Sequence, residues 1–178
     1  REIAEVSPNR YYLARDNLLI RDLSNIPSFF VAPPPATINQ NYYRPVFLAS
    51  LAIDTALGGG NPAAFHLTNL VIHGIVTLLV FLFALRILKD RWAALAAAVL
   101  FAVHPVHGET VSIIYPRAGT LSALFVLLAL LVHSKESATR AGAVSARGAT
   151  AVLAFLAMAS KDDGVMVGAM LLLYDIAF

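Results

Sequence analysis

The sequence predicts an all-α, polytopic membrane protein with about five transmembrane helices, an interfacial helix and an N-terminal outer loop. The first observation is composition: 58% of the residues are hydrophobic and 13% are charged, with a mean hydropathy of +0.71. A soluble domain is about 45–50% apolar and about 25% charged. The second observation is that residues 65–178 consist of apolar runs separated by short polar breaks. This pattern is typical of a chain that crosses a bilayer repeatedly.

Composition also excludes several functional classes. The net charge of +2, without a basic block or an acidic tail, gives no indication of nucleic-acid binding. The absence of cysteine excludes disulfides and thiolate metal sites. No P-loop, nucleophile elbow, dinucleotide-binding glycine pattern or zinc signature occurs, and we expect neither a cofactor nor a metal. Because the chain begins at Arg1 and ends in an apolar run, we expect a fragment or processed piece of a longer protein.

Residues 1–64 are predicted to form an outer-face loop with short interfacial helices. The run Pro33-Pro34-Pro35 cannot continue a helix. Residues 46–57 have a helical composition, but a membrane span needs about 20 residues. We therefore expect this segment to lie at the membrane interface, closed by the glycines at 58–60.

Residues 65–178 are predicted to form a transmembrane helix bundle. Several of the apolar runs are shorter than the bilayer core, which is tolerated when helices pack in a bundle whose polar ends line a water-filled cavity. Alanine, glycine, serine and threonine recur in them and favour close helix packing. The expected spans are residues 66–88, 92–103, 117–132, 148–159 and 164–178.

Loop charges predict an orientation. Loop 86–91 carries three cations, and loop 133–147 carries three more. By the positive-inside rule, these two loops are cytoplasmic. Segments 1–65, 104–116 and 160–163 then face the outside together.

The segments predicted to lie outside carry the candidate site residues. His104 and His107, three residues apart, could be metal ligands with Glu109 nearby, but Pro105 interrupts the helix and no spacing specifies a third ligand. We favour a polar rim or a substrate contact. Lys161 and the two following acids are most simply a solvated turn between helices. The substrate-binding candidates are Arg44, His104, His107, Glu109, Arg117, Lys161 and Asp162.

A polar stripe lies within the first long span. His66, Asn69 and His73 are separated by three and four residues and therefore share one helix face. Such a stripe should face the bundle interior. Hydrogen bonding between helices is the simpler interpretation, and a substrate path is the alternative. Asp54 is a lone acid that could form an ion pair or extend to the interface.

Several of these segments, in their order and spacing, resemble the membrane half of the transmembrane, tetratricopeptide-repeat-containing protein O-mannosyltransferases and their bacterial relatives. These proteins belong to the GT-C class of polytopic glycosyltransferases. The resemblance covers roughly residues 11–175, and its most specific element is the His-Pro-Val-His-x-Glu segment before Arg117-Ala118. The segments that carry it are residues 41–46, 65–73, 100–111, 117–118 and 160–162.

The resemblance implies a sugar donor carried on a polyisoprenyl phosphate and an acceptor on the outer face. It also implies a general base in the first outer loop, where the family usually has an acidic pair. The matching place here is Arg15-Asp16, so Asp16 is the general-base candidate and one acid is replaced by a cation. Arg117 and Lys161 suit contact with the lipid phosphate. An acid commonly follows the Arg-Ala pair, and this chain has Gly119 there.

Two functional hypotheses follow. The first is a GT-C-like membrane glycosyltransferase domain, mannosyltransferase-like if catalytic, in a bacterial inner membrane with its active face outside. Its expected partners are the bilayer, a polyisoprenyl-linked sugar donor and a protein acceptor, with no nucleic acid. The alternative is a non-catalytic transmembrane subunit of a larger complex, such as an energy-transducing one, built on the same scaffold. The enzyme hypothesis expects Asp16, Glu109, Arg117 and Lys161 around one outer cavity, whereas the subunit hypothesis expects internal pairs.

Overall fold

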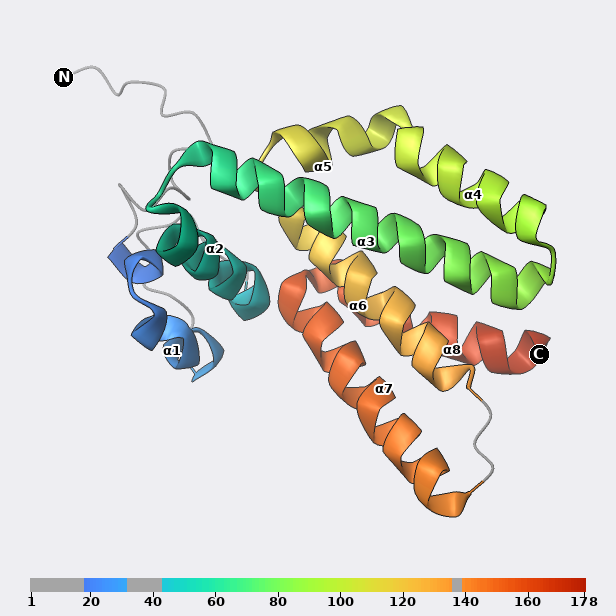
Figure 1. The fold of residues 1–178 in the computed structure, drawn as a ribbon. Helices are drawn as coiled ribbons and strands as arrows, with labels where there is room; N and C mark the ends of the chain where they lie inside the picture. The colour runs from blue at the N-terminus through green and yellow to red at the C-terminus, as the bar shows by residue number, and fades with distance from the viewer. Residues whose placement is uncertain (1–17, 32–42, 136–138) are drawn as a thin grey trace.

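The computed structural model describes residues 18–31, 43–135 and 139–178, and within these ranges the chain is helical without any strand (Figure 1). This confirms the all-α prediction. The α-helices are α1 (Ile26–Val31), α2 (Pro45–Gly58), α3 (Pro62–Leu88), α4 (Arg91–Val103), α5 (Gly108–Ser112), α6 (Arg117–His133), α7 (Arg140–Ser160) and α8 (Met166–Ala177). Short 3-10 helices are η2 (Leu18–Arg21), η3 (Leu23–Asn25), η4 (Pro105–His107) and η5 (Asp162–Val165).

Two of these helices, α3 and α7, are long and apolar enough to cross a membrane. In the 18-residue apolar segment that qualifies each helix, only 22% is buried inside the protein for α3 and 11% for α7. A core helix of a soluble protein would bury most of such a window, so these faces are suited to lipid or to other chains. Helices α2, α4 and α6 are apolar but shorter. The crossing of the membrane by five helices therefore remains a prediction.

The turn between α2 and α3 follows from its glycines and from an asparagine cap. Gly59 and Gly60 have φ values of 59° and 78°, in the left-handed region that favours glycine. Asn61 then caps α3, because its Oδ1 accepts a hydrogen bond from Ala63 N at 3.0 Å. A side chain at Gly58 would collide with Ala64. The prediction that the glycine run ends α2 is confirmed.

A tight reversal joins α3 to α4. Lys89 ends α3 with φ 55°, and Asp90 starts α4 by accepting hydrogen bonds from the backbone N–H groups of Trp92 and Ala93, both at 2.8 Å. Helix α4 then packs back along α3 through small side chains. Ala94 and Ala98 are buried on this face, as is typical of closely packed membrane helices.

Helix α7 begins earlier than its expected span at residue 148. Thr139 Oγ1 accepts a hydrogen bond from Gly142 N at 3.1 Å and caps the helix, which starts at Arg140. Half of the expected loop 133–147 is therefore helical. The apolar run ends at the charged residues, but the capping threonine and the alanines that follow it support a helix across them.

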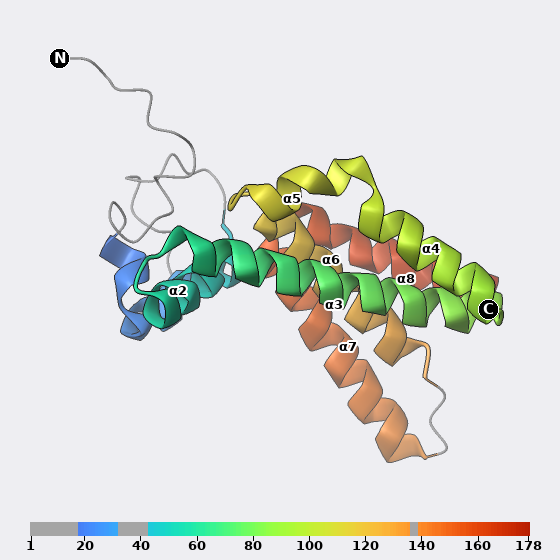
Figure 2. The same cartoon turned by 45° about the horizontal axis from the view of Figure 1, so that its top comes forward.

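Helices α3 and α6 run in the same direction. Arg117, at the start of α6, donates to the carbonyl of Phe65 near the start of α3, and Arg86 near the end of α3 donates to the carbonyl of Ser134. Figure 2 shows the C-terminus of α8 at the same end as the α3–α4 turn, as Figure 1 does, whereas the start of α7 lies away from α3 in both views.

The two groups of loops consequently lie at opposite ends of the α3–α6 pair. The starts of α2, α3 and α6 and the end of α7 meet at one end. An apolar cluster that includes Phe29, Phe47, Leu51 and Phe65 supports that end. The cationic loop 86–91 lies at the other end, and which end faces the cytoplasm stays a prediction.

Candidate functional site

Arg44 connects three segments that are distant in sequence. It precedes α2, and its side chain is only 9% exposed. Its Nη1 donates to the hydroxyl of Tyr115 at 2.8 Å, and its Nη2 donates to Oδ2 of Asp162 at 3.2 Å. Burial opposes the charged state, but the hydrogen bonds to Asp162 and Tyr115 outweigh it and raise the pKa of Arg44. The guanidinium is therefore a permanent positive charge beneath the α7–η5 corner.

The Lys161 corner lies beside Arg44. The ammonium of Lys161 donates to the carboxylate of Asp163, and this hydrogen bond lowers the pKa of Asp163. Asp162 and Asp163 are exposed, and the Lys161 side chain is 35% exposed. The expected solvated turn is present, but Asp162 also anchors it to the start of α2.

Arg117 lies in the interior, with an exposed fraction of 0%. Its Nη1 donates to Oδ2 of Asp54 at 2.5 Å, its Nε to Oδ1 of Asn69, and its Nη2 to the carbonyl of Phe65 at 2.6 Å. Asp54 in turn accepts a hydrogen bond from the hydroxyl of Thr68 at 2.7 Å. The expected contact of Arg117 with a lipid phosphate is not available in this arrangement, because the guanidinium is enclosed by protein groups.

The polar stripe of α3 forms hydrogen bonds between segments, as the simpler interpretation expected. Asn69 Nδ2 donates to the carbonyl of Ile113 at 3.0 Å. His73 Nε2 donates to the carbonyl of Ala102 at 3.3 Å. Asn69 thus links Arg117 to the segment before α6, and His73 links α3 to the end of α4.

His107 packs against His73 of α3, and His104 lies beside His107. The ring of His107 lies 4.3 Å from Phe101 and 5.3 Å from His73, measured between centroids. His104 Nδ1 accepts a hydrogen bond from Val106 N at 3.2 Å and so caps η4. Burial, together with the neighbouring imidazoles, lowers the pKa of His107. Within the described ranges, no three histidine, cysteine or acidic side chains are grouped to hold a metal ion.

Glu109 and Asp16 are the remaining candidates. Glu109 is exposed on α5, and Asp16 lies outside the described residues. The sequence-based site is therefore divided. Arg44, Lys161 and Asp162 lie together, and Arg117 lies in a separate buried network. His107 packs against His73 of α3, with His104 beside it. Sequence reasoning did not single out Tyr115, and its only local signal was an aromatic residue before Pro116.

Comparison with curated proteins finds relatives of this chain. Over 137 residues, 75% of the chain, it is 36% identical to the protein O-mannosyl-transferase TMTC2 of Mus musculus. It is 37% identical to TMTC1 of the same organism over 75% of the chain, and 30% identical to TMTC3 over 83%. This chain is a relative of the TMTC protein O-mannosyl-transferases. The resemblance stated from its motifs is thereby confirmed.

The relationship to the TMTC proteins concerns one part of each relative. The chain spans 16% of the length of TMTC2 and 15% of that of TMTC1 from Mus musculus. No family model matches the chain, and no solved structure matches it. The activity of the complete relatives is therefore only proposed for this chain.

Proposed function

We propose that the chain is part of the membrane domain of a GT-C-type glycosyltransferase that transfers a mannose-like sugar from a polyisoprenyl phosphate to a hydroxyl group. We place it in a bacterial inner membrane, crossed about five times, with the Arg44 end outside. The observation that supports this most strongly is the similarity to three protein O-mannosyl-transferases over three quarters of the chain or more.

In the proposed reaction, the acceptor hydroxyl oxygen attacks the anomeric carbon of the sugar. The bond from that carbon to the phosphate oxygen breaks, and the polyisoprenyl phosphate leaves with the electron pair. The carboxylate of Asp16 takes the hydroxyl proton. A nearby cation stabilises the negative charge that develops on the leaving phosphate.

We assign these roles according to whether each side chain is exposed or buried. Lys161 is partly exposed at the outer end and is the cation that we assign to the phosphate. Arg44 holds Asp162, the residue that follows Lys161, and so positions the corner. Arg117 is a positioning residue, since its guanidinium donates to Asp54, Asn69 and the carbonyl of Phe65 in the interior. We retain His104, His107 and Glu109 as candidate contacts to the acceptor or the sugar.

The test is Asp16→Asn in the complete protein, assayed for transfer of labelled mannose from polyisoprenyl phosphate in reconstituted membranes. Loss of a general base should reduce transfer by about 10²–10⁴-fold, with folded protein still recovered. The matched control is Asp22→Asn in the same segment, where the carboxylate accepts a hydrogen bond from Ser24 N at 2.9 Å and asparagine can replace it. Unchanged transfer in Asp16→Asn removes Asp16 from the mechanism.

One observation favours the alternative of a non-catalytic membrane subunit. Both Arg44 and Arg117 are paired inside the protein, which is what that hypothesis expects. In that case the exposed apolar faces of α7 and α8 would pack against other chains. Purification from native membranes at constant stoichiometry with a larger complex, without sugar transfer, would favour this function over the enzyme.

A further inference from the structure

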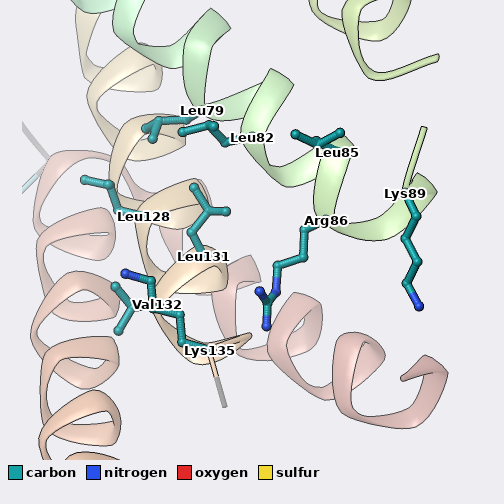
Figure 3. A pocket seen from close by; sticks show the side chains of 9 residues that line it. All are labelled: Leu79, Leu82, Leu85, Arg86, Lys89, Leu128, Leu131, Val132 and Lys135. Carbon is teal, nitrogen blue, oxygen red and sulfur yellow. The ribbon is translucent and has the colours of Figure 1, made fainter. Parts of the chain in front are cut away.

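A groove lies between the far ends of α3 and α6, at the opposite end from Arg44. Its volume is about 620 Å³. Figure 3 shows leucines from the two helices facing one another across it. They are Leu79, Leu82 and Leu85 from α3 and Leu128 and Leu131 from α6. Of the proposed transfer residues that the structure describes, none lines this groove.

Three cations surround the polar end of the groove. Arg86 and Lys89 come from the end of α3, and Lys135 follows α6. In Figure 3 the Arg86 side chain extends from α3 toward the end of α6, where it donates to the carbonyl of Ser134. All three residues are exposed. Lys89 also has the left-handed backbone that favours glycine, so a cation occupies a position where glycine would be easier.

A second cavity of about 500 Å³ adjoins these cations. Arg86, Lys89 and Lys135 line it as well, together with Tyr174 of α8. The cations therefore stand between an apolar groove and a more polar space. This order of an apolar part, a ring of positive charge and a polar part matches the order of groups along a phospholipid with an anionic headgroup.

Among the described residues, the two acids nearest these cations have other partners. Asp175 is paired with His133 at 2.7 Å. The carboxylate of Asp90 accepts hydrogen bonds from the first N–H groups of α4. Neither acid pairs with a groove cation in any contact that the structure shows.

The groove also has the depth of one leaflet. Leu79 and Lys89 are ten residues apart, which is about 15 Å along a helix. Half of the bilayer hydrocarbon core is also about 15 Å. Trp92 is 66% exposed just beyond Lys89, as expected of an aromatic residue at the membrane interface.

We propose that this groove binds a glycerophospholipid with an anionic headgroup, taken from the leaflet next to loop 86–91. Its acyl chains lie on the leucines, and Arg86, Lys89 and Lys135 hold its phosphate and headgroup charge. Charge complementarity distinguishes this lipid from a zwitterionic one. The site is separate from the proposed sugar-donor site at the other end and does not depend on the transfer reaction.

The test uses the complete protein in phosphatidylcholine nanodiscs with a trace of phosphatidylglycerol that carries a photoreactive group in its acyl chain. Mass spectrometry locates the label. We expect peptides containing residues 79–85 and 128–132 to be labelled, on the order of tenfold more than with the equivalent phosphatidylcholine probe. The variant Lys89→Gln/Lys135→Gln should lose labelling on the order of tenfold, because these two cations line the groove and attract the anionic headgroup there. It leaves the bond from Arg86 to Ser134 in place.

The matched control is Arg91→Gln/Arg140→Gln, which removes two cations near the same loops but none that lines the groove. It should label as the wild type does. Equal labelling by the two lipids would overturn the proposal, and so would an equal loss in the two variants. Displacement of the phosphatidylglycerol probe by excess polyisoprenyl phosphate, with no displacement by unlabelled phosphatidylglycerol, would assign the groove to the sugar donor instead.

Discussion

Arg117 and Asp54 form a buried ion pair, with Nη1 and Oδ2 2.5 Å apart and side-chain exposures of 0% and 5%. The pair joins α6 to α2, and Arg117 also holds α3 through Asn69 and the carbonyl of Phe65. Charges removed from water are tolerated only when partners satisfy them. The pair and its hydrogen bonds therefore determine how α2, α3 and α6 meet.

Removing one partner of this pair should be strongly destabilising. In Asp54→Asn, the positive charge of Arg117 stays buried without its counter-ion. We expect the free energy of unfolding to fall by about 3–5 kcal/mol. Denaturant unfolding in mixed micelles measures it. The control is Asp163→Asn, which alters an exposed carboxylate and should change stability little. Equal stability of the two variants would mean that the pair does not hold the helices.

Gly119 should accept an acid that pairs with Lys161. A Cβ at this third position of α6 would lie 3.8 Å from Cδ and 3.9 Å from Nζ of Lys161, which is an ordinary contact distance. Gly119→Ala should stabilise the helix by about 0.5–1 kcal/mol. Gly119→Asp adds an anion in the first helical turn beside a cation.

We therefore expect Gly119→Asp to match or exceed Gly119→Ala by up to about 1 kcal/mol in thermal unfolding at low salt. The excess should disappear in a Lys161→Ala background. An aspartate variant that is less stable than the alanine variant would show that Lys161 is not close enough to pair.

The contact between Arg44 and Asp162 should contribute little on its own, although the arginine is buried. Asp162 is 56% exposed, so water screens the pair. A double-mutant cycle with Arg44→Gln and Asp162→Asn should give a coupling free energy below about 1 kcal/mol. A parallel cycle with Tyr115→Phe isolates the second hydrogen bond of Arg44. A coupling of several kcal/mol to Asp162 would contradict the screening argument.

His107 should make stability depend on pH. Burial and the imidazoles of His73 and His104 lower its pKa in the folded protein. The unfolded chain then binds more protons than the folded one between the lowered pKa and the ordinary value near 6.5, so stability falls as pH drops through that interval. His107→Gln should reduce this fall in thermal unfolding midpoints measured between pH 7.5 and 5. An unchanged pH profile would show that His107 is not responsible.

The sequence by itself determined the helices and much of their order at the two ends. Apolar runs and the glycines after α2 act over a few residues, so a linear pattern contains them. The cations in loop 86–91 similarly predicted which helix ends lie on the same side of the bundle. The start of α7 at Arg140 depends on the cap at Thr139, whereas the apolar pattern by itself ends at the arginines.

Tertiary structure decided which charged groups meet. Arg117 was assigned to a phosphate from its type and position, but it is enclosed by Asp54 and Asn69, which lie 63 and 48 residues earlier in the chain. Arg44 and Asp162 are 118 residues apart. Partners at such separations depend on how helices cross, and burial changes a guanidinium from a ligand for lipid into a connection between helices. The leucine groove between α3 and α6 likewise exists only once their ends are aligned.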